Sequence, residues 1–149
     1  MNTEMLAGPG NDFTHQVIIS HIIYGLMDKF KKIKKYNNYI PLPELSLKPE
    51  NNQIPDITVW KTVRDTPAFP VVLIEICWSN RIKDEVLKLT SIMESRTSIE
   101  EAFIIDKESL EIKRIYRTKA KSRKPSSPQK SSKIEIFNVD LSKLLVRVQ

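Results

Sequence analysis

Two carboxylates in this chain have the residue type and spacing needed for metal-assisted chemistry. Asp56 follows a proline in the segment IPDITVW, and Glu75 interrupts the otherwise apolar run VVLIEIC. An ionised carboxylate among apolar neighbours costs on the order of several kcal/mol unless it is paired or holds a cation. If the two segments are neighbouring strands, Asp56 and Glu75 can converge on one divalent cation such as Mg²⁺, which prefers oxygen ligands.

A lysine in the segment that follows could complete such a site. The stretch KDEVLK places Asp84 and Lys88 four residues apart, and therefore on one face of a helix. A lysine beside the cation would stabilise developing negative charge or help to activate a water molecule. These groups suffice to hydrolyse a phosphodiester without a cysteine or histidine nucleophile.

The same residues also have purely structural interpretations. Asp56 could cap a turn after its proline. Glu75 could form a structural salt bridge with Lys88 or Arg81. Taken alone, Asp84 and Lys88 are typical of an ion pair on a helix surface.

Two helices are expected to frame these residues. The first is predicted to begin at Asp12 or Thr14 and to end at about Lys35. Its apolar residues recur at helical spacing on one face: Ile18, Ile22, Leu26, Phe30 and Ile33. The second is predicted in SNRIKDEVLKLTSIMESRT, with Ser79 or Asn80 as its N-cap.

The remaining segments predict short strands. Extended pieces are expected near Leu42–Leu47 and Ile57–Trp60, followed by a turn or loop at TVRDTPAFP and a buried strand at VVLIEIC. Two further strands are expected in EEAFIIDKESLEIKRIYR, and the chain closes with a strand and a short amphipathic piece. The order α-β-β-β-α-β-β predicts an α/β fold, a mixed β-sheet flanked by helices.

Size and composition limit the classes to which the protein can belong. A chain of 149 residues corresponds to about one domain, so 1–149 is predicted to be a single domain. No apolar run approaches a membrane span, and the first residues show no signal pattern, so no membrane partner is expected. The single cysteine, Cys77, excludes an internal disulfide framework and a cysteine-rich zinc site. A cytoplasmic location is expected.

The net charge of +6 is concentrated in one segment. Residues 117–133 hold seven positive charges and no acid, whereas residues 1–116 are nearly neutral. This Lys/Ser/Pro segment predicts a flexible basic loop available for backbone phosphates. Its candidate nucleic-acid-binding residues are Lys119, Lys121, Arg123 and Lys124. A second group of lysines, in KFKKIKKY, is more typical of a solvated helix end than of a phosphate site.

The order of these motifs resembles the PD-(D/E)xK nuclease superfamily, which has the restriction-endonuclease-like fold. The resemblance rests on the Pro-Asp pair that ends at Asp56 and precedes a strand, and on the hydrophobic strand with Glu75 about twenty residues later. The sequence is similar to one bacterial branch, the Uma-two family of restriction-endonuclease-like proteins. THQVIISHIIYGLMDKF resembles its helix beginning with His-Gln, and LIEICWSNRIKDEVLKLTSIMESRTSIEEAFIID resembles its strand, Ser-rich turn, Asp-x-x-x-Lys helix and closing strand.

The resemblance implies an α-β-β-β-α-β core and a set of site residues. Asp56 and Glu75 would be the metal-binding acids, with the backbone carbonyl of Ile76 as a further ligand for Mg²⁺, or Mn²⁺ as a substitute. Cys77 stands where the superfamily has its lysine, and a thiol lacks that charge and reach. The branch resembled here carries its lysine on the next helix, which implies Lys88, with Lys83 second. His15 and Gln16 match the helix start and would line the site.

Three functions follow from these observations. The first is a Mg²⁺-dependent endonuclease acting on nucleic acid, with DNA as the expected substrate and a homodimer as an expected form. The second is a catalytically inactive nuclease-like fold that serves as a binding or regulatory module, favoured by Cys77 and the near-neutral body. The third is a dimeric structural protein in which the basic loop is only a solvated linker.

Overall fold

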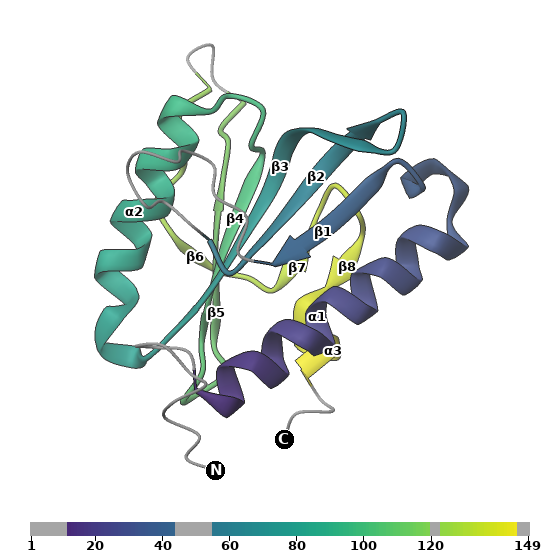
Figure 1. The fold of residues 1–149 in the computed structure, drawn as a ribbon. Helices are drawn as coiled ribbons and strands as arrows, with labels where there is room; N and C mark the ends of the chain where they lie inside the picture. The colour runs from purple at the N-terminus through teal and green to yellow at the C-terminus, as the bar shows by residue number, and fades with distance from the viewer. Residues whose placement is uncertain (1–11, 44–54, 120–122, 146–149) are drawn as a thin grey trace.

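The structure is a computed structural model that describes residues 12–43, 55–119 and 123–145. Six strands form one sheet in the order β1-β2-β3-β4-β5-β6, and helices cover both faces (Figure 1). The strands are β1 (Tyr39–Pro43), β2 (Ile57–Val63), β3 (Thr66–Cys77), β4 (Glu101–Asp106), β5 (Ile112–Tyr116) and β6 (Gln129–Lys130). The other elements are α1 (Phe13–Lys32), α2 (Ile82–Ser95), β7 (Lys133–Ile134), β8 (Val139–Asp140) and α3 (Leu141–Leu145), with 3-10 turns at Lys34–Tyr36 and Ser79–Arg81. The predicted α/β class is therefore confirmed.

Helix α1 begins where its sequence predicts. The Asp12 side chain accepts a hydrogen bond from the backbone N–H of His15 and so caps the helix. The apolar stripe is buried, including Ile18, Ile22 and Leu26. The helix ends at Lys32 rather than Lys35, because Ile33 adopts an extended conformation.

Strands β2 and β3 form a hairpin. The turn or loop expected at TVRDTPAFP is therefore much shorter than predicted. The turn contains only Arg64 and Asp65, whose φ angles of 53° and 60° lie in the left-handed region. Two such residues match the twist of a tight hairpin. Residues 66–70 therefore belong to β3, which pairs antiparallel with β2. Of the extended piece expected at Leu42–Leu47, residues 44–47 lie outside the described residues.

Helix α2 connects two parallel strands. Strand β3 pairs parallel with β4, and a parallel pair requires a crossover such as this helix. The predicted caps, Ser79 and Asn80, are wrong, because both lie in the preceding 3-10 turn. Arg81 occupies the N-cap position without a side-chain capping hydrogen bond. The negative charges of Asp84 and Glu85 in the first turn instead interact favourably with the helix dipole.

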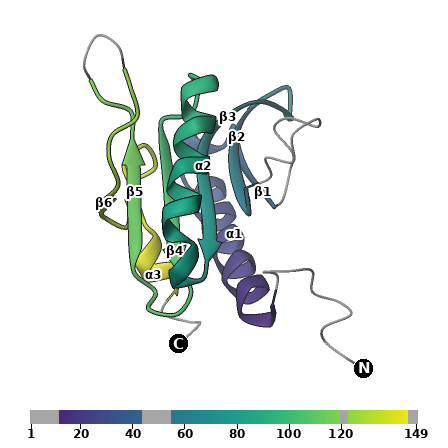
Figure 2. The same cartoon turned by 90° about the vertical axis from the view of Figure 1, so that its left-hand side faces the viewer.

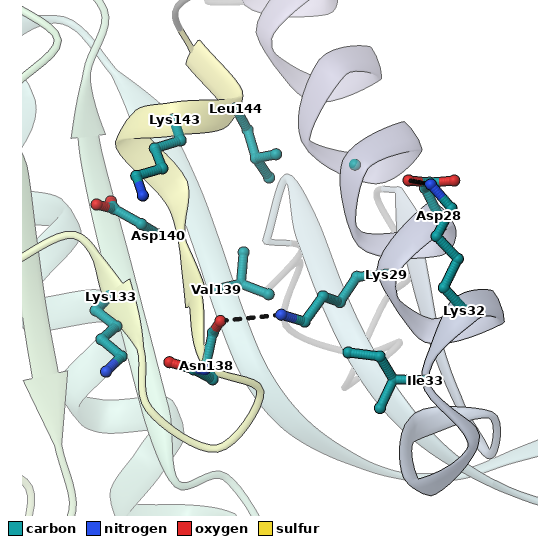
Figure 3. A pocket seen from close by; sticks show the side chains of 11 residues that line it. Asp28, Lys29, Lys32, Ile33, Lys133, Asn138, Val139, Asp140, Lys143 and Leu144 are labelled. Atoms are coloured by element: carbon teal, nitrogen blue, oxygen red, sulfur yellow. Dashed lines mark hydrogen bonds and ion pairs between the residues drawn. The ribbon is translucent and has the colours of Figure 1, made fainter.

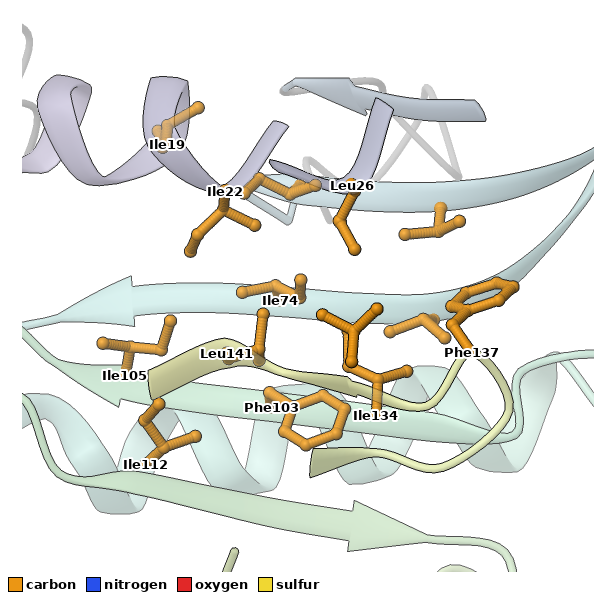
Figure 4. Packing of buried hydrophobic residues seen from close by; sticks show 14 of the residues in the cluster. Ile19, Ile22, Leu26, Ile74, Phe103, Ile105, Ile112, Ile134, Phe137 and Leu141 are labelled. Atoms are coloured by element: carbon orange, nitrogen blue, oxygen red, sulfur yellow. The ribbon is translucent and has the colours of Figure 1, made fainter. Parts of the chain in front are cut away.

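Two hydrophobic clusters hold the helices to the sheet. On one face, α1, α3 and the β7–β8 hairpin pack on the central strands, with Ile22, Ile74 and Phe103 fully buried (Figure 4). On the other face, Leu89 and Met93 of α2 pack on the opposite side of the same strands (Figure 2). Side chains alternate along a strand, so Ile74 and Ile76 contact one layer, whereas Leu73 and Cys77 contact the other.

The segment predicted as a basic loop, residues 117–133, contains backbone pairing of the β type. Arg117 forms a bridge with Pro125, and β6 adds a two-residue edge strand to β5. The flexibility of residues 117–133 stays a prediction. No helix among the described ranges is long and apolar enough to cross a membrane.

Candidate active site

Sheet pairing brings Asp56 and Glu75 together. Ile57 of β2 lies opposite Ile74 of β3, so continuing this register by one residue places Asp56 opposite Glu75. The chain leaves the strand pairing at this point, and the Asp56 side chain substitutes for it by accepting a 2.7 Å hydrogen bond from the Ile76 N–H. The expectation that the two acids come from neighbouring strands therefore agrees with the structure.

The first turn of α1 adds a histidine to this pair. His15 Nε2 lies 2.9 Å from Asp56 Oδ1, and both residues are buried. Because an ionised carboxylate only accepts hydrogen bonds, we assign the Nε2 proton to His15. The second ring nitrogen, Nδ1, is buried without a hydrogen-bond partner among the described residues. Gln16, expected beside it, is exposed, and its role at the site stays a prediction.

Helix α2 supplies the lysine from the other side of the sheet. Lys88 Nζ donates a 2.6 Å hydrogen bond to Glu75 Oε2 and lies 3.3 Å from Glu85 Oε2. Lys83, the second choice, is exposed and has no ion pair with these acids among the described residues. The surface pair expected between Asp84 and Lys88 is absent from the described residues, because Asp84 pairs with Arg81 at 3.1 Å.

The pKa values of the two carboxyl groups are shifted in opposite directions. Burial alone would raise the pKa of Asp56, but hydrogen bonds from His15, Glu75 and the Ile76 N–H hold it below its usual value. Burial and the neighbouring Asp56 raise the pKa of Glu75 well above its usual value, despite the opposing charge of Lys88. Ionising both acids at once is therefore costly, and Glu75 is the one whose protonated form is favoured by burial and by Asp56.

Lys88 is charged at neutral pH, whereas Cys77 is not. Burial disfavours the ammonium group, but Glu75 and Glu85 raise the pKa of Lys88 above its usual value. Burial and the nearby carboxylates raise the pKa of the Cys77 thiol to about 12. Cys77 is thus a neutral, buried group that supplies neither a cation nor a thiolate.

The donor set suits a cation that keeps much of its water. Two adjacent carboxyl groups that share a proton form a site in which a cation can replace that proton. The residues described contain no cluster of three or more His, Cys, Asp or Glu side chains arranged for a metal ion. Mg²⁺ is commonly bound by one or two carboxylates, with water and substrate oxygens filling the remaining positions. The pair Asp56 and Glu75 fits that pattern.

A buried lysine that the sequence analysis missed supports the start of α1. Lys107 is almost fully buried, and its Nζ donates a 3.0 Å hydrogen bond to Asp12 Oδ2. Asp12 is the N-cap of α1 and accepts a hydrogen bond from the backbone N–H of His15. Lys107 therefore helps to fix the position of that histidine. The same Nζ lies 4.0 Å from the ring centroid of Trp78, which is 44% exposed. The contact joins residues 95 positions apart, so no local pattern signals it.

The structure places Lys119, Arg123 and Lys124 of the basic loop toward the opposite end of the sheet from these acids. Strand β3 ends and α1 begins at the lower end of the sheet in Figure 1, whereas the chain leaves β5 at the upper end. Arg123 forms an ion pair with Glu100 at 2.7 Å, while Lys119 and Lys124 are exposed. Lys121 lies outside the described residues. Among the described residues, the predicted catalytic residues are thus not brought together with Lys119, Arg123 or Lys124, and the binding role of the loop stays a prediction.

One arginine of the basic segment has a structural role. The Arg117 guanidinium donates hydrogen bonds to the carbonyl oxygens of Met93, Arg96, Ile99 and Arg123. The first of these carbonyls is in the last turn of α2, where helical partners are missing. Arg117 therefore closes the end of α2 instead of facing solvent.

Comparison with known proteins yields a structural likeness. No family model and no curated protein matches the sequence. A crystal structure from Anabaena variabilis, described as "a putative nuclease belonging to DUF820", superposes with a TM-score of 0.57 and 12% identity. The match covers 91% of this chain and 82% of the other. At this identity the likeness shows that the two chains share a fold.

Proposed function

We propose that the protein is a metal-dependent nuclease that hydrolyses phosphodiester bonds, with DNA as its substrate. The observation that carries this proposal is the convergence of Asp56, Glu75 and Lys88 from β2, β3 and α2. Two buried acids and a lysine meet at one end of the sheet, although no pattern of core packing requires them there. The fold shared with a protein described as a nuclease supports the same function.

Each residue has a distinct proposed role. Asp56 and Glu75, with the Ile76 carbonyl, would hold Mg²⁺ or Mn²⁺, which stabilises negative charge on a phosphate group. Lys88 places its ammonium group beside the same phosphate and adds a fixed positive charge. His15 orients Asp56 through its 2.9 Å hydrogen bond. Lys107 and Asp12 hold His15 in place and act only through it.

Plasmid cleavage tests this function directly. Supercoiled DNA is incubated with the wild-type protein in Mg²⁺ or Mn²⁺, beside Asp56→Asn, Glu75→Gln and the exposed control Glu94→Gln, which lies outside the site and the groove described below. We expect nicking or linearisation by the wild type and the control, and none by the two site variants. Cleavage that survives Asp56→Asn would come from another source and would contradict the proposal. Circular dichroism of each variant verifies that it is folded.

A second candidate function is binding without catalysis. It is favoured by the neutral Cys77 thiol, which stands where the resembled superfamily has its lysine. In that case DNA binding would persist in EDTA, and no cleavage would occur with either metal. The plasmid assay combined with a binding assay distinguishes the two functions.

A further inference from the structure

A groove between α1 and the C-terminal elements collects lysines from distant parts of the chain. The groove has a volume of about 770 Å³ (Figure 3). Its lining consists of Gly25, Asp28, Lys29, Lys32, Ile33, Lys133, Asn138, Val139, Asp140, Lys143 and Leu144, which we call the lysine groove. Four of these residues are lysines, and they come from α1, β7 and α3.

Packing of the aromatic core fixes the two walls of the groove. Phe30 of α1 and Phe137 of the β7–β8 turn have ring centroids 4.6 Å apart. Across the groove, Lys29 Nζ donates a 3.2 Å hydrogen bond to the Asn138 carbonyl (Figure 3). At the other end, a Cβ added to Gly25 would lie 2.5 Å from the Leu144 side chain, so α1 and α3 are in close contact. The groove is therefore built into the fold.

The two acids in the groove offset only part of the charge of its four lysines. Asp28 is paired with Lys32 at 3.0 Å. Asp140 accepts hydrogen bonds from Ser132 and Ser142. Lys133 has only a loose contact of 3.9 Å with Glu135, and both side chains are about half exposed.

Lys143 has no ion pair within 4.0 Å among the described residues, and Lys29 donates only to a neutral carbonyl. An excess of positive charge therefore faces the groove.

Helix-end electrostatics explain only part of this arrangement. Lysines in the last turn of α1 interact favourably with the helix dipole, which accounts for Lys29 and Lys32. The dipole of α1 gives no reason for Lys133 and Lys143, which lie about a hundred residues later and line the same groove, although Lys143 is itself in the last turn of the short helix α3. The sequence pattern KFKKIKKY favours a solvated helix end, and Lys31, Lys34 and Lys35 are exposed as expected, whereas Lys29 and Lys32 also line the groove.

We propose that the lysine groove binds backbone phosphates of a nucleic acid away from the active site. Flexible ammonium groups act as point charges for phosphate. An open groove with an apolar floor of Ile33, Val139 and Leu144 suits a continuous sugar–phosphate chain. His15 and Lys29 are fourteen residues apart on α1, so the groove lies about 21 Å along the helix from the active site. The inference rests on the proposed function, because it takes nucleic acid to be the substrate.

Binding of a fluorescent DNA duplex in EDTA tests the groove without catalysis. Anisotropy is measured between about 50 and 200 mM NaCl for the wild type, for Lys133→Ala/Lys143→Ala and for Lys31→Ala/Lys34→Ala. The control pair removes the same charge from exposed lysines outside the groove. Thermal unfolding verifies that each variant is folded.

We expect the groove variant to bind at least about tenfold more weakly at low salt and to lower the slope of log K against log[salt] by about 2. The control pair should change affinity much less. Equal losses in the two double variants, or no DNA binding by the wild type, would overturn the groove proposal. If groove-dependent binding holds but plasmid cleavage fails, the hydrolytic function alone is wrong. If cleavage occurs and the groove variant binds like its control, the groove proposal alone is wrong.

Discussion

Glu75 lies within eight consecutive buried positions of β3, where a charge would be costly on its own. The Glu75 carboxyl group interacts with Asp56 and accepts a hydrogen bond from Lys88. The three groups come from separate elements, so none of them is explained by packing within its own element. At the scale of single residues, the site is a buried acid pair held beside a fixed ammonium group.

Lys88→Met should abolish most nuclease activity while leaving the protein folded. Methionine has similar length, but it removes the charge that lies beside Glu75. We expect kcat to fall by about 10²- to 10³-fold, as for the loss of one electrostatic stabiliser. Lys83→Met is the matched control on the same helix and should retain activity. Equal loss in both variants would show that Lys88 has no special role.

Metal affinity should rise with pH because the cation replaces the proton of Glu75. The pKa of Glu75 is raised by burial and by Asp56, so the free protein keeps this proton above the usual pKa of a glutamate. Below that raised pKa, Mn²⁺ binding releases about one proton, and affinity should increase about tenfold per pH unit. Above it, affinity should level off.

Calorimetric titration in buffers of different ionisation enthalpy measures both the affinity and the proton release. Asp28→Asn should show the same pH dependence as the wild type, and Glu75→Gln should lose it. Affinity that does not change with pH would contradict proton displacement.

At the scale of elements, Arg117 connects the end of α2 to the loop before β4. Its donors satisfy carbonyl groups that the helix leaves without partners. Arg117→Met should therefore reduce the free energy of unfolding by about 1–3 kcal/mol. Urea denaturation measures this change, and Lys119→Met removes the same charge from an exposed neighbour as a control. Equal stability of the two variants would show that the carbonyl contacts contribute nothing.

The β2–β3 turn carries strain that can be relieved. Arg64 and Asp65 have positive φ angles, which asparagine and glycine adopt at lower cost. Replacing the pair by Asn-Gly should stabilise the protein by about 1 kcal/mol and raise Tm by about 2–4 °C. Asp65→Ala tests the cause, because alanine gains nothing at positive φ. A stabilising effect of alanine would contradict the argument from backbone strain.

At the scale of the whole molecule, the site joins both layers of the fold. His15 belongs to α1 on one face of the sheet, and Lys88 belongs to α2 on the other. A cation held by Asp56 and Glu75 binds only the folded chain, so it should stabilise the protein as a unit. At a concentration of 100 times Kd, the gain is about 2.7 kcal/mol.

Thermal unfolding with and without MnCl₂ measures this gain. Tm should rise by several degrees for the wild type and for Asp28→Asn, and it should not change for Asp56→Asn. An equal rise in all three proteins would indicate metal binding elsewhere.

Local patterns in the sequence were sufficient for most elements. Helix α1, the buried strand with Glu75 and the helix with Lys88 follow from apolar periodicity, which depends only on neighbouring residues. A turn or loop was expected at TVRDTPAFP, but its restriction to Arg64 and Asp65 was missed, because Arg64 is not a usual residue at positive φ and Pro67 and Pro70 are atypical of a strand. The N-cap of α2 was missed, because the Ser79 hydroxyl instead donates a hydrogen bond to Asp106 at the end of β4.

The sequence by itself determined that Glu75 needs a partner, since no local neighbour could compensate a buried carboxylate. It also nominated Asp56 and Lys88, which the tertiary structure brings into contact with Glu75. Only the tertiary structure decided that His15 orients Asp56, that Lys107 supports Asp12 and that Arg117 points inward. It also assembled the lysine groove from α1, β7 and α3. The physical reason is that periodicity reports which face of an element is buried, whereas contacts across tens of residues depend on strand order and layer packing.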